Sequence, residues 1–228
     1  MADGLIPRNV TEAVKAPRPV KKEMMPLSPD QARTLLEAAR GERLETLYAL
    51  AVTTGMRQGE LLGLKWEDVD METGTLQVRR TLSTATGSGI RFGAPKTAKS
   101  RRSIRIPELV LSSLRRHRRS QLQERMRFVG LWEDHDLVFT TRVGTPISRA
   151  DLITRSFKPL LQRTDLPNIR FHDLRHTCAT LLLSRGVHAK LVQELLGHST
   201  IAVTLDTYSH VLPGMGDGLA DTMDEALG

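Results

Sequence analysis

Apolar residues recur at helical spacing along most of the chain, and signals for helix ends stand beside them. The first helix starts at Ser28, because a serine followed by proline and, three positions on, by glutamine is typical of a capped N-terminus. It runs to Gly41, a residue type that often ends helices. The same reasoning predicts helices over residues 43–54, 60–64, 107–128, 149–164, 173–185, 189–196 and 201–211. The pattern therefore predicts a mostly helical protein.

The period of the pattern changes between Thr75 and Ile106. Residues 75–82 alternate between apolar and polar, as a half-buried strand does. Gly87 and Gly89 indicate a turn, and two further short strands are predicted over residues 90–92 and 103–106. We therefore predict an α+β fold, mostly α with a small three-stranded antiparallel sheet.

Composition divides the chain into three parts. Residues 1–27 are rich in lysine, arginine and proline, which predicts an extended basic linker or arm. Residues 28–212 hold the regular pattern and are predicted to form one folded domain. Residues 213–228 contain no lysine or arginine, and Met215, Leu219, Met223 and Leu227 would form one apolar stripe on a helix. This tail either closes over its own domain or packs on another protomer.

The charge of the chain favours a polyanionic partner. The 228 residues carry a formal net charge of +7, and nucleic acid is the commonest partner of such a basic protein. No apolar run approaches the ~18 residues that span a bilayer, so no membrane association is expected. The N-terminus shows no signal-peptide core, and Cys178 has no cysteine to pair with, so we expect a cytoplasmic protein with a buried thiol.

Four segments carry residues suited to phosphate chemistry. They are TTGMRQGELLGLKWEDVD at 53–70, APKTAKSRRSIRIP at 94–107, FHDLRHTCATLLLSRG at 171–186 and ELLGHSTIAVTLDTYSHV at 194–211. Each alone has an ordinary structural interpretation. Together, and in this order, they resemble the catalytic domain of tyrosine recombinases, the phage-type integrases, over residues 28–212. The resemblance implies the fold of the DNA breaking-rejoining enzymes.

The resemblance implies that Tyr208 attacks a DNA phosphodiester and is left joined to the 3′ phosphate. During the attack, negative charge builds on the non-bridging oxygens, which Arg57 and Arg175 would bind with charge-assisted hydrogen bonds. A tyrosine hydroxyl has an ordinary pKa near ~10 and needs help to lose its proton. His172 matches the histidine that assists this transfer.

Other residues match supporting positions of the family. Lys96 matches the lysine that protonates the leaving 5′ oxygen, and His198 matches a further phosphate ligand. Glu60 matches an acidic residue that supports Arg57, and His176 is interpreted as a packing residue behind the site. Lys99, Arg101 and Arg102 are predicted to contact DNA. Neither metal nor nucleotide cofactor is implied.

The resemblance also implies partners. The expected substrate is double-stranded DNA, bound by a tetramer on paired sites, with accessory DNA-bending proteins as further candidate partners. The family usually carries an N-terminal helical domain, for which there is no room before Ser28. Residues 8–27 resemble the linker after such a domain, so we expect a truncated form of a longer protein.

Three alternatives stay open. A zinc site could use His172 and His176, with His188, His198 and His210 downstream. Against it, HDLRH lacks the glutamate of H-E-x-x-H, and Arg175 would repel a cation. A type I topoisomerase with a tyrosine nucleophile would use much the same chemistry. A DNA-binding protein that has lost activity is the third alternative.

Overall fold

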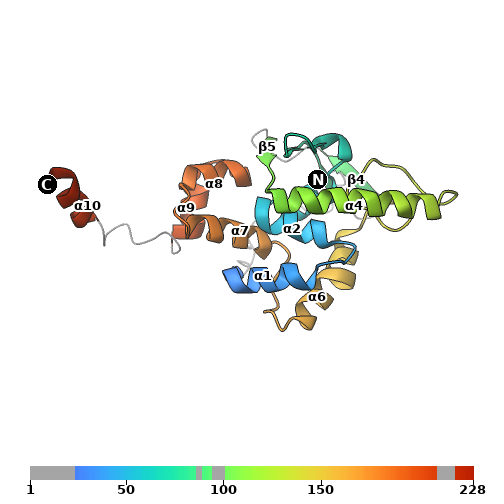
Figure 1. Cartoon of the computed structure of the whole chain (residues 1–228), viewed down its shortest axis with the longest axis horizontal. Helices are drawn as coiled ribbons and strands as arrows, with labels where there is room; N and C mark the ends of the chain where they lie inside the picture. The colour runs from blue at the N-terminus through green and yellow to red at the C-terminus, as the bar shows by residue number, and fades with distance from the viewer. Residues whose placement is uncertain (1–23, 86–88, 94–100, 210–218) are drawn as a thin grey trace, which may run out of the picture.

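A central buried helix organises the fold. The structure is a computed structural model that describes residues 24–85, 89–93, 101–209 and 219–228. In it, α2 (Glu45–Thr54) contacts α1 (Pro29–Ala38), α4 (Glu108–Arg127) and α7 (Asp173–Leu183). Thr46 through Val52 are all buried, which explains why this segment is apolar on every face. Figure 1 shows α4 extending toward one end of the molecule, with α7, α8 (Ala189–Leu196) and α9 (Ile201–Tyr208) at the other.

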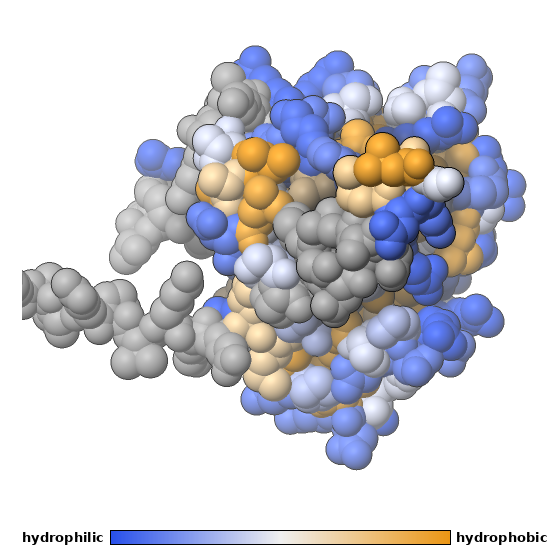
Figure 2. Space-filling model, turned by 90° about the vertical axis from the view of Figure 1, so that its left-hand side faces the viewer, coloured by the Kyte–Doolittle hydropathy of each residue, from blue (hydrophilic) through white to orange (hydrophobic). Residues whose placement is uncertain are grey.

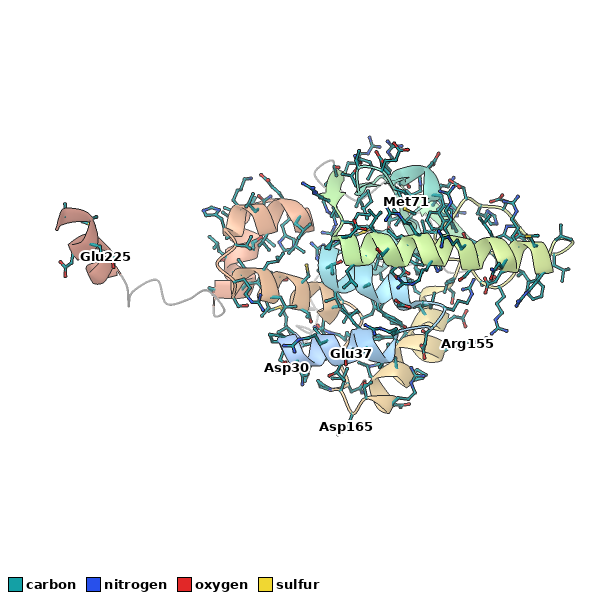
Figure 3. All side chains as sticks on the ribbon, viewed as in Figure 1. Asp30, Glu37, Met71, Arg155, Asp165 and Glu225 are labelled. Atoms are coloured by element: carbon teal, nitrogen blue, oxygen red, sulfur yellow. The ribbon has the colours of Figure 1, made fainter. Side chains whose placement is uncertain are left out.

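Local signals account for most helix boundaries. The hydroxyl of Ser28 accepts a hydrogen bond from the Gln31 amide at 3.2 Å, and the Gln31 side chain accepts from the Ser28 amide at 3.0 Å, which forms the predicted capping box. Helix α4 starts directly after Pro107 and ends at Arg127, as predicted. Asp30 and Glu37, labelled in Figure 3, lie on the exposed face of α1, opposite buried Leu35.

The strands form two small antiparallel sheets. β1 (Val69–Asp70), β2 (Thr75–Val78) and β5 (Arg102–Arg105) make a three-stranded sheet in the order β1-β2-β5, with Leu76 opposite Ile104. β3 (Thr81–Ala85) and β4 (Gly89–Gly93) pair separately. The single strand predicted over residues 75–82 is therefore wrong. It breaks at Arg79 and Arg80, whose guanidiniums form ion pairs with Asp68 in the 3-10 turn η2 (Trp66–Asp68).

The helix predicted over residues 149–164 is three consecutive elements. They are α5 (Arg149–Asp151), the π-helical segment η4 (Leu152–Phe157) and α6 (Lys158–Arg163). Pro159 has no amide hydrogen for the normal α-helical bond, so the wider π turns precede it. The short helix α3 (Gln58–Leu62) lies where a helix near residues 60–64 was predicted.

Two groups of buried side chains hold these elements. The larger one includes Tyr48, whose ring stacks on Phe157 with centroids 6.0 Å apart. The smaller one joins α7, α8 and α9 through Ala179, Leu183, Val192, Leu196 and Tyr208. Burying a leucine contributes about 1.5–3 kcal/mol, so the leucines of the smaller group hold α8 on α7, and α9 in turn contacts α8.

The C-terminal helix α10 (Leu219–Leu227) stands apart from the other helices in Figure 1, and Glu225 marks it in Figure 3. Met223 is 54% exposed and Leu227 80% exposed. The described part of the tail therefore does not cover its own domain in this structure.

Candidate active site

A tight turn after α2 brings two candidate arginines together. Gly55 ends α2 with a left-handed φ of +60°, and a Cβ there would come within 2.4 Å of Leu196 Cδ2. The freed Gly55 carbonyl accepts a hydrogen bond from Arg175 Nη1 at 2.7 Å. Arg57 follows two residues later and caps α3. The turn therefore places Arg57 beside the α7 residue Arg175.

Glu60 anchors Arg57 from behind. Its carboxylate accepts from Arg57 Nη1 at 2.8 Å and from the Arg57 amide at 3.0 Å. The Glu60 side chain is 3% exposed, whereas the Arg57 side chain is 38% exposed. Burial acts to raise the pKa of Glu60, but the charge and hydrogen bonds of Arg102 and Arg57 outweigh it and leave that pKa below its usual value. Glu60 is thus a buried carboxylate that orients an accessible guanidinium.

Arg175 is buried and tied to two helix ends. Besides Gly55, it binds the carbonyl of Leu196 at the end of α8, from Nη2 at 2.7 Å. Burial, followed by the nearby charge of Arg57, lowers the pKa of Arg175 to about 9. The two positive charges therefore lie close enough to oppose each other, and a bound anion would relieve this repulsion.

The two candidate histidines lie in the same positive field. Desolvation, then the charges of Arg175 and Arg57, lowers the pKa of His172 and brings that of His198 to about 4. His198 Nδ1 hydrogen-bonds Thr204 Oγ1 at 2.9 Å, and its carbonyl accepts from Gln193 Nε2 at 2.6 Å. Sequence reasoning missed Thr204 and Gln193, which are both buried.

Tyr208 is buried against His176. The tyrosine is 1% exposed, and its hydroxyl is hydrogen-bonded to His176 Nδ1 at 2.8 Å. Burial raises the pKa of Tyr208 to about 12, and burial followed by the charge of His172 lowers the pKa of His176 to about 4. Both groups are therefore neutral at neutral pH. The ring of His172 lies edge-on to His176, with centroids 5.1 Å apart.

The basic segment before β5 is only partly described. Lys96 and Lys99 lie outside the described residues. Arg101 is exposed, and its contact with DNA stays a prediction. Arg102 is a correction: its side chain is 7% exposed and binds Glu60 inside the domain. Strand alternation could have shown this, because Arg102 shares a strand face with buried Ile104.

The histidines of the site bear on the zinc alternative. Within the described ranges, no group of three or more histidine, cysteine, aspartate or glutamate side chains could hold a metal ion. His210, one of the histidines downstream of His172, lies outside them. No helix in the described part is long and apolar enough to cross a membrane.

Figure 2 looks at the end of the molecule that carries α8, α9 and α10, and it shows hydrophobic residues exposed among hydrophilic ones. Leu191, Ile201 and Val203 on these helices are 59%, 38% and 41% exposed. These helices therefore carry accessible apolar side chains in this structure.

Comparison with known proteins gives the family. A model of the phage integrase family matches residues 26–214. The chain is 37% identical over 217 residues to a tyrosine recombinase XerC-like protein of Caldanaerobacter subterraneus subsp. tengcongensis, covering 90% of this chain and 55% of that protein. It is 30% identical over 225 residues to the ICEBs1 integrase of Bacillus subtilis, covering 98% and 60%. The chain thus spans little more than half the length of these relatives.

Solved structures show the same fold. The Tn1549 transposon integrase in complex with circular intermediate DNA gives a TM-score of 0.75 at 23% identity, over 97% of this chain and 72% of that one. The XerA recombinase gives 0.63 at 27% identity, over 91% and 66%. The predicted fold class is confirmed. Since the family model matches most of the chain and a 37% identical relative covers 90% of it, the chain belongs to the phage integrase family of tyrosine recombinases.

Proposed function

We propose that this chain is the catalytic domain of a site-specific recombinase, which cleaves and rejoins double-stranded DNA through Tyr208. The observation that carries the proposal is the pair of neighbouring guanidiniums, Arg57 and Arg175. Glu60 holds the first from behind, and the carbonyls of Gly55 and Leu196 hold the second. Two fixed cations that repel each other suit a phosphodiester, whose negative charge grows in the transition state.

In the proposed reaction, Tyr208 Oη forms a bond to phosphorus and the bond from phosphorus to the 5′ oxygen breaks. The products are a 3′-phosphotyrosyl link and a free 5′ hydroxyl. A 5′ hydroxyl from a partner strand then attacks the same phosphorus and releases Tyr208. The phosphotyrosyl link conserves the energy of the broken bond, so rejoining needs no outside energy source.

Proton transfers complete each step. His172 takes the phenolic proton as Tyr208 attacks, and its lowered pKa keeps it neutral and able to accept. Lys96 gives a proton to the leaving 5′ oxygen. His198, neutral in the free protein, binds a phosphate oxygen through the ring nitrogen that does not contact Thr204.

Tyr208 cannot attack from the position described above, because it is 1% exposed and bonded to His176. The proposal therefore includes a step in which the hydroxyl leaves His176 and turns toward Arg57 and Arg175.

We assign the active form to a tetramer on paired DNA sites in the bacterial cytoplasm. The acidic tail would dock between protomers, and DNA-bending proteins would be further partners.

The test is capture of a covalent adduct. The protein is incubated with a pool of nicked duplexes of random sequence, on which the cleaved strand end diffuses away and prevents rejoining. Adducts that survive detergent are isolated and mapped by mass spectrometry, and a phosphotyrosyl link at Tyr208 is expected. Tyr208→Phe should bind the DNA but form no adduct, and an undiminished yield from it would refute the assignment. Relaxation of supercoiled plasmid without strand exchange would favour the topoisomerase alternative.

A further inference from the structure

Arg102 joins two parts of the site from inside the domain. Its side chain is 7% exposed, and it lies on the inner face of β5. Its Nε donates to the carbonyl of Leu195 at 2.6 Å, and its Nη2 donates to Glu60 Oε2 at 3.0 Å. One guanidinium thus bridges α3 and the end of α8.

The contact with Glu60 bears on Arg57. Glu60 Oε1 accepts from the Arg57 guanidinium, while Oε2 accepts from the Arg57 amide and from Arg102. Arg102 therefore keeps the carboxylate ionised and holds one of its oxygens in place. Without that charge, burial would favour the protonated form of Glu60, which binds a guanidinium less strongly.

The contact with Leu195 bears on His198. The last carbonyls of a helix lack partners within it, and cations there are favourable. At the end of α8, Arg102 donates a hydrogen bond to the carbonyl of Leu195, and Arg175 donates one to the carbonyl of Leu196. Gly197 then turns the chain with a φ of +67°, and His198 follows directly. Arg102 and Arg175 together fix the backbone position from which the side chain of His198 extends.

We propose that Arg102 is a positioning residue of the phosphate site: it sets Arg57 through Glu60 and sets His198 through the end of α8. This inference rests on the function proposed above. It goes beyond the residues that the resemblance assigns, and it replaces the expectation that Arg102 contacts DNA. A purely structural role would instead affect folding and cleavage together.

The experiment compares Arg102→Gln with Arg105→Gln. Both remove one positive charge from β5, but Arg105 is exposed and has no assigned role in the site. Equal DNA affinity is expected for the two variants. Arg102→Gln should melt somewhat lower, because buried Glu60 loses a charged partner, but both variants should stay folded at the assay temperature. Adduct formation by Arg102→Gln should fall between about tenfold and a hundredfold, the effect of a displaced catalytic group. On the acid side of the pH profile, adduct formation by Arg102→Gln should begin to fall at a higher pH than in the wild type. The reason is that Glu60 loses the neighbouring charge of Arg102, which raises its pKa.

Several outcomes decide the inference. Equal adduct rates and pH profiles for the two glutamine variants would overturn it, and so would parallel losses of melting temperature, binding and cleavage. If Arg102→Gln does not fold, Arg102→Lys carries the test. The ammonium keeps the charge but not the planar fork, so cleavage should fall several-fold with unchanged melting. Wild-type cleavage by Arg102→Lys would overturn the inference, whereas a wild-type protein without any Tyr208 adduct would overturn the proposed function.

Discussion

The hydrogen bond between His176 and Tyr208 makes a sharp prediction about where the tyrosine lies in the free protein. His176→Phe keeps an aromatic ring next to Tyr208, whose ring centroid lies 5.7 Å from that of His176. It removes the nitrogen that binds the hydroxyl at 2.8 Å. Tyr208 would then be buried with an unpaired hydroxyl, so we expect it to leave its pocket more often.

The size of the effect follows from the cost of that unpaired group. A buried hydroxyl without a partner costs about 1–3 kcal/mol. Since each 1.4 kcal/mol is a factor of ten, the exposed fraction of Tyr208 should rise between about fivefold and a hundredfold. Exposure also returns the pKa of Tyr208 from about 12 toward 10, which increases the reactive tyrosinate.

Nitration with tetranitromethane at pH 8, followed by peptide mass spectrometry, measures this exposure. The chain has two tyrosines, and Tyr48 is an internal reference because it is buried with its hydroxyl 2.6 Å from Ser156 Oγ. Tyr208 should be nitrated faster in His176→Phe, and Tyr48 should not change. His176→Asn is the matched control, since an asparagine can place a polar atom near the position of Nδ1. Unchanged nitration of Tyr208 in His176→Phe would refute the reasoning, as would faster nitration of both tyrosines.

Three further predictions concern the site, acid stability and the tail. Arg175→Lys cannot hold Gly55 and the end of α8 and also bind phosphate, so adduct formation should fall by roughly two to three decades; wild-type rates would contradict this. The pKa values of His176 and His198 are lowered to about 4 from 6.5, so their contribution to stability is present above pH 6.5 and lost as the pH falls toward 4. The melting temperature should fall across this window, and less so in His198→Gln; a flat profile would argue against the buried neutral rings. Deleting residues 214–228 should leave melting unchanged, because Met223 and Leu227 are exposed, but should weaken assembly in a native gel shift on two-site DNA. A large loss of melting temperature with unchanged assembly would show that the tail packs on its own domain.

The parts of the fold that were predicted correctly depend on local chemistry. Ser28 and Gln31 form their capping box within one turn, and Pro107 marks the start of α4 through a local backbone restriction. The errors arose where distant residues decide. The break after β2 depends on Arg79 and Arg80 meeting Asp68, and no pattern within residues 75–82 reveals that partner. β1 has only two residues, too few to show alternation.

The candidate site divides in the same way. The types of residue in the site were predicted from four motifs and their order. The contacts among these residues depend instead on how α7, α8 and α9 pack. His172 and His176 lie four apart on one stretch of sequence, so spacing alone does not decide which histidine meets the tyrosine. Packing of α9 on α8, and of α8 on α7, places the hydroxyl of Tyr208 on His176. The resemblance implies that His172 takes the proton during attack. These two statements are compatible if Tyr208 exchanges one histidine for the other as it leaves its pocket, and the 5.1 Å between the two rings makes that exchange a short movement. Under the proposed function, a tyrosine that stays neutral and buried until it turns would be protected from reaction before DNA binds.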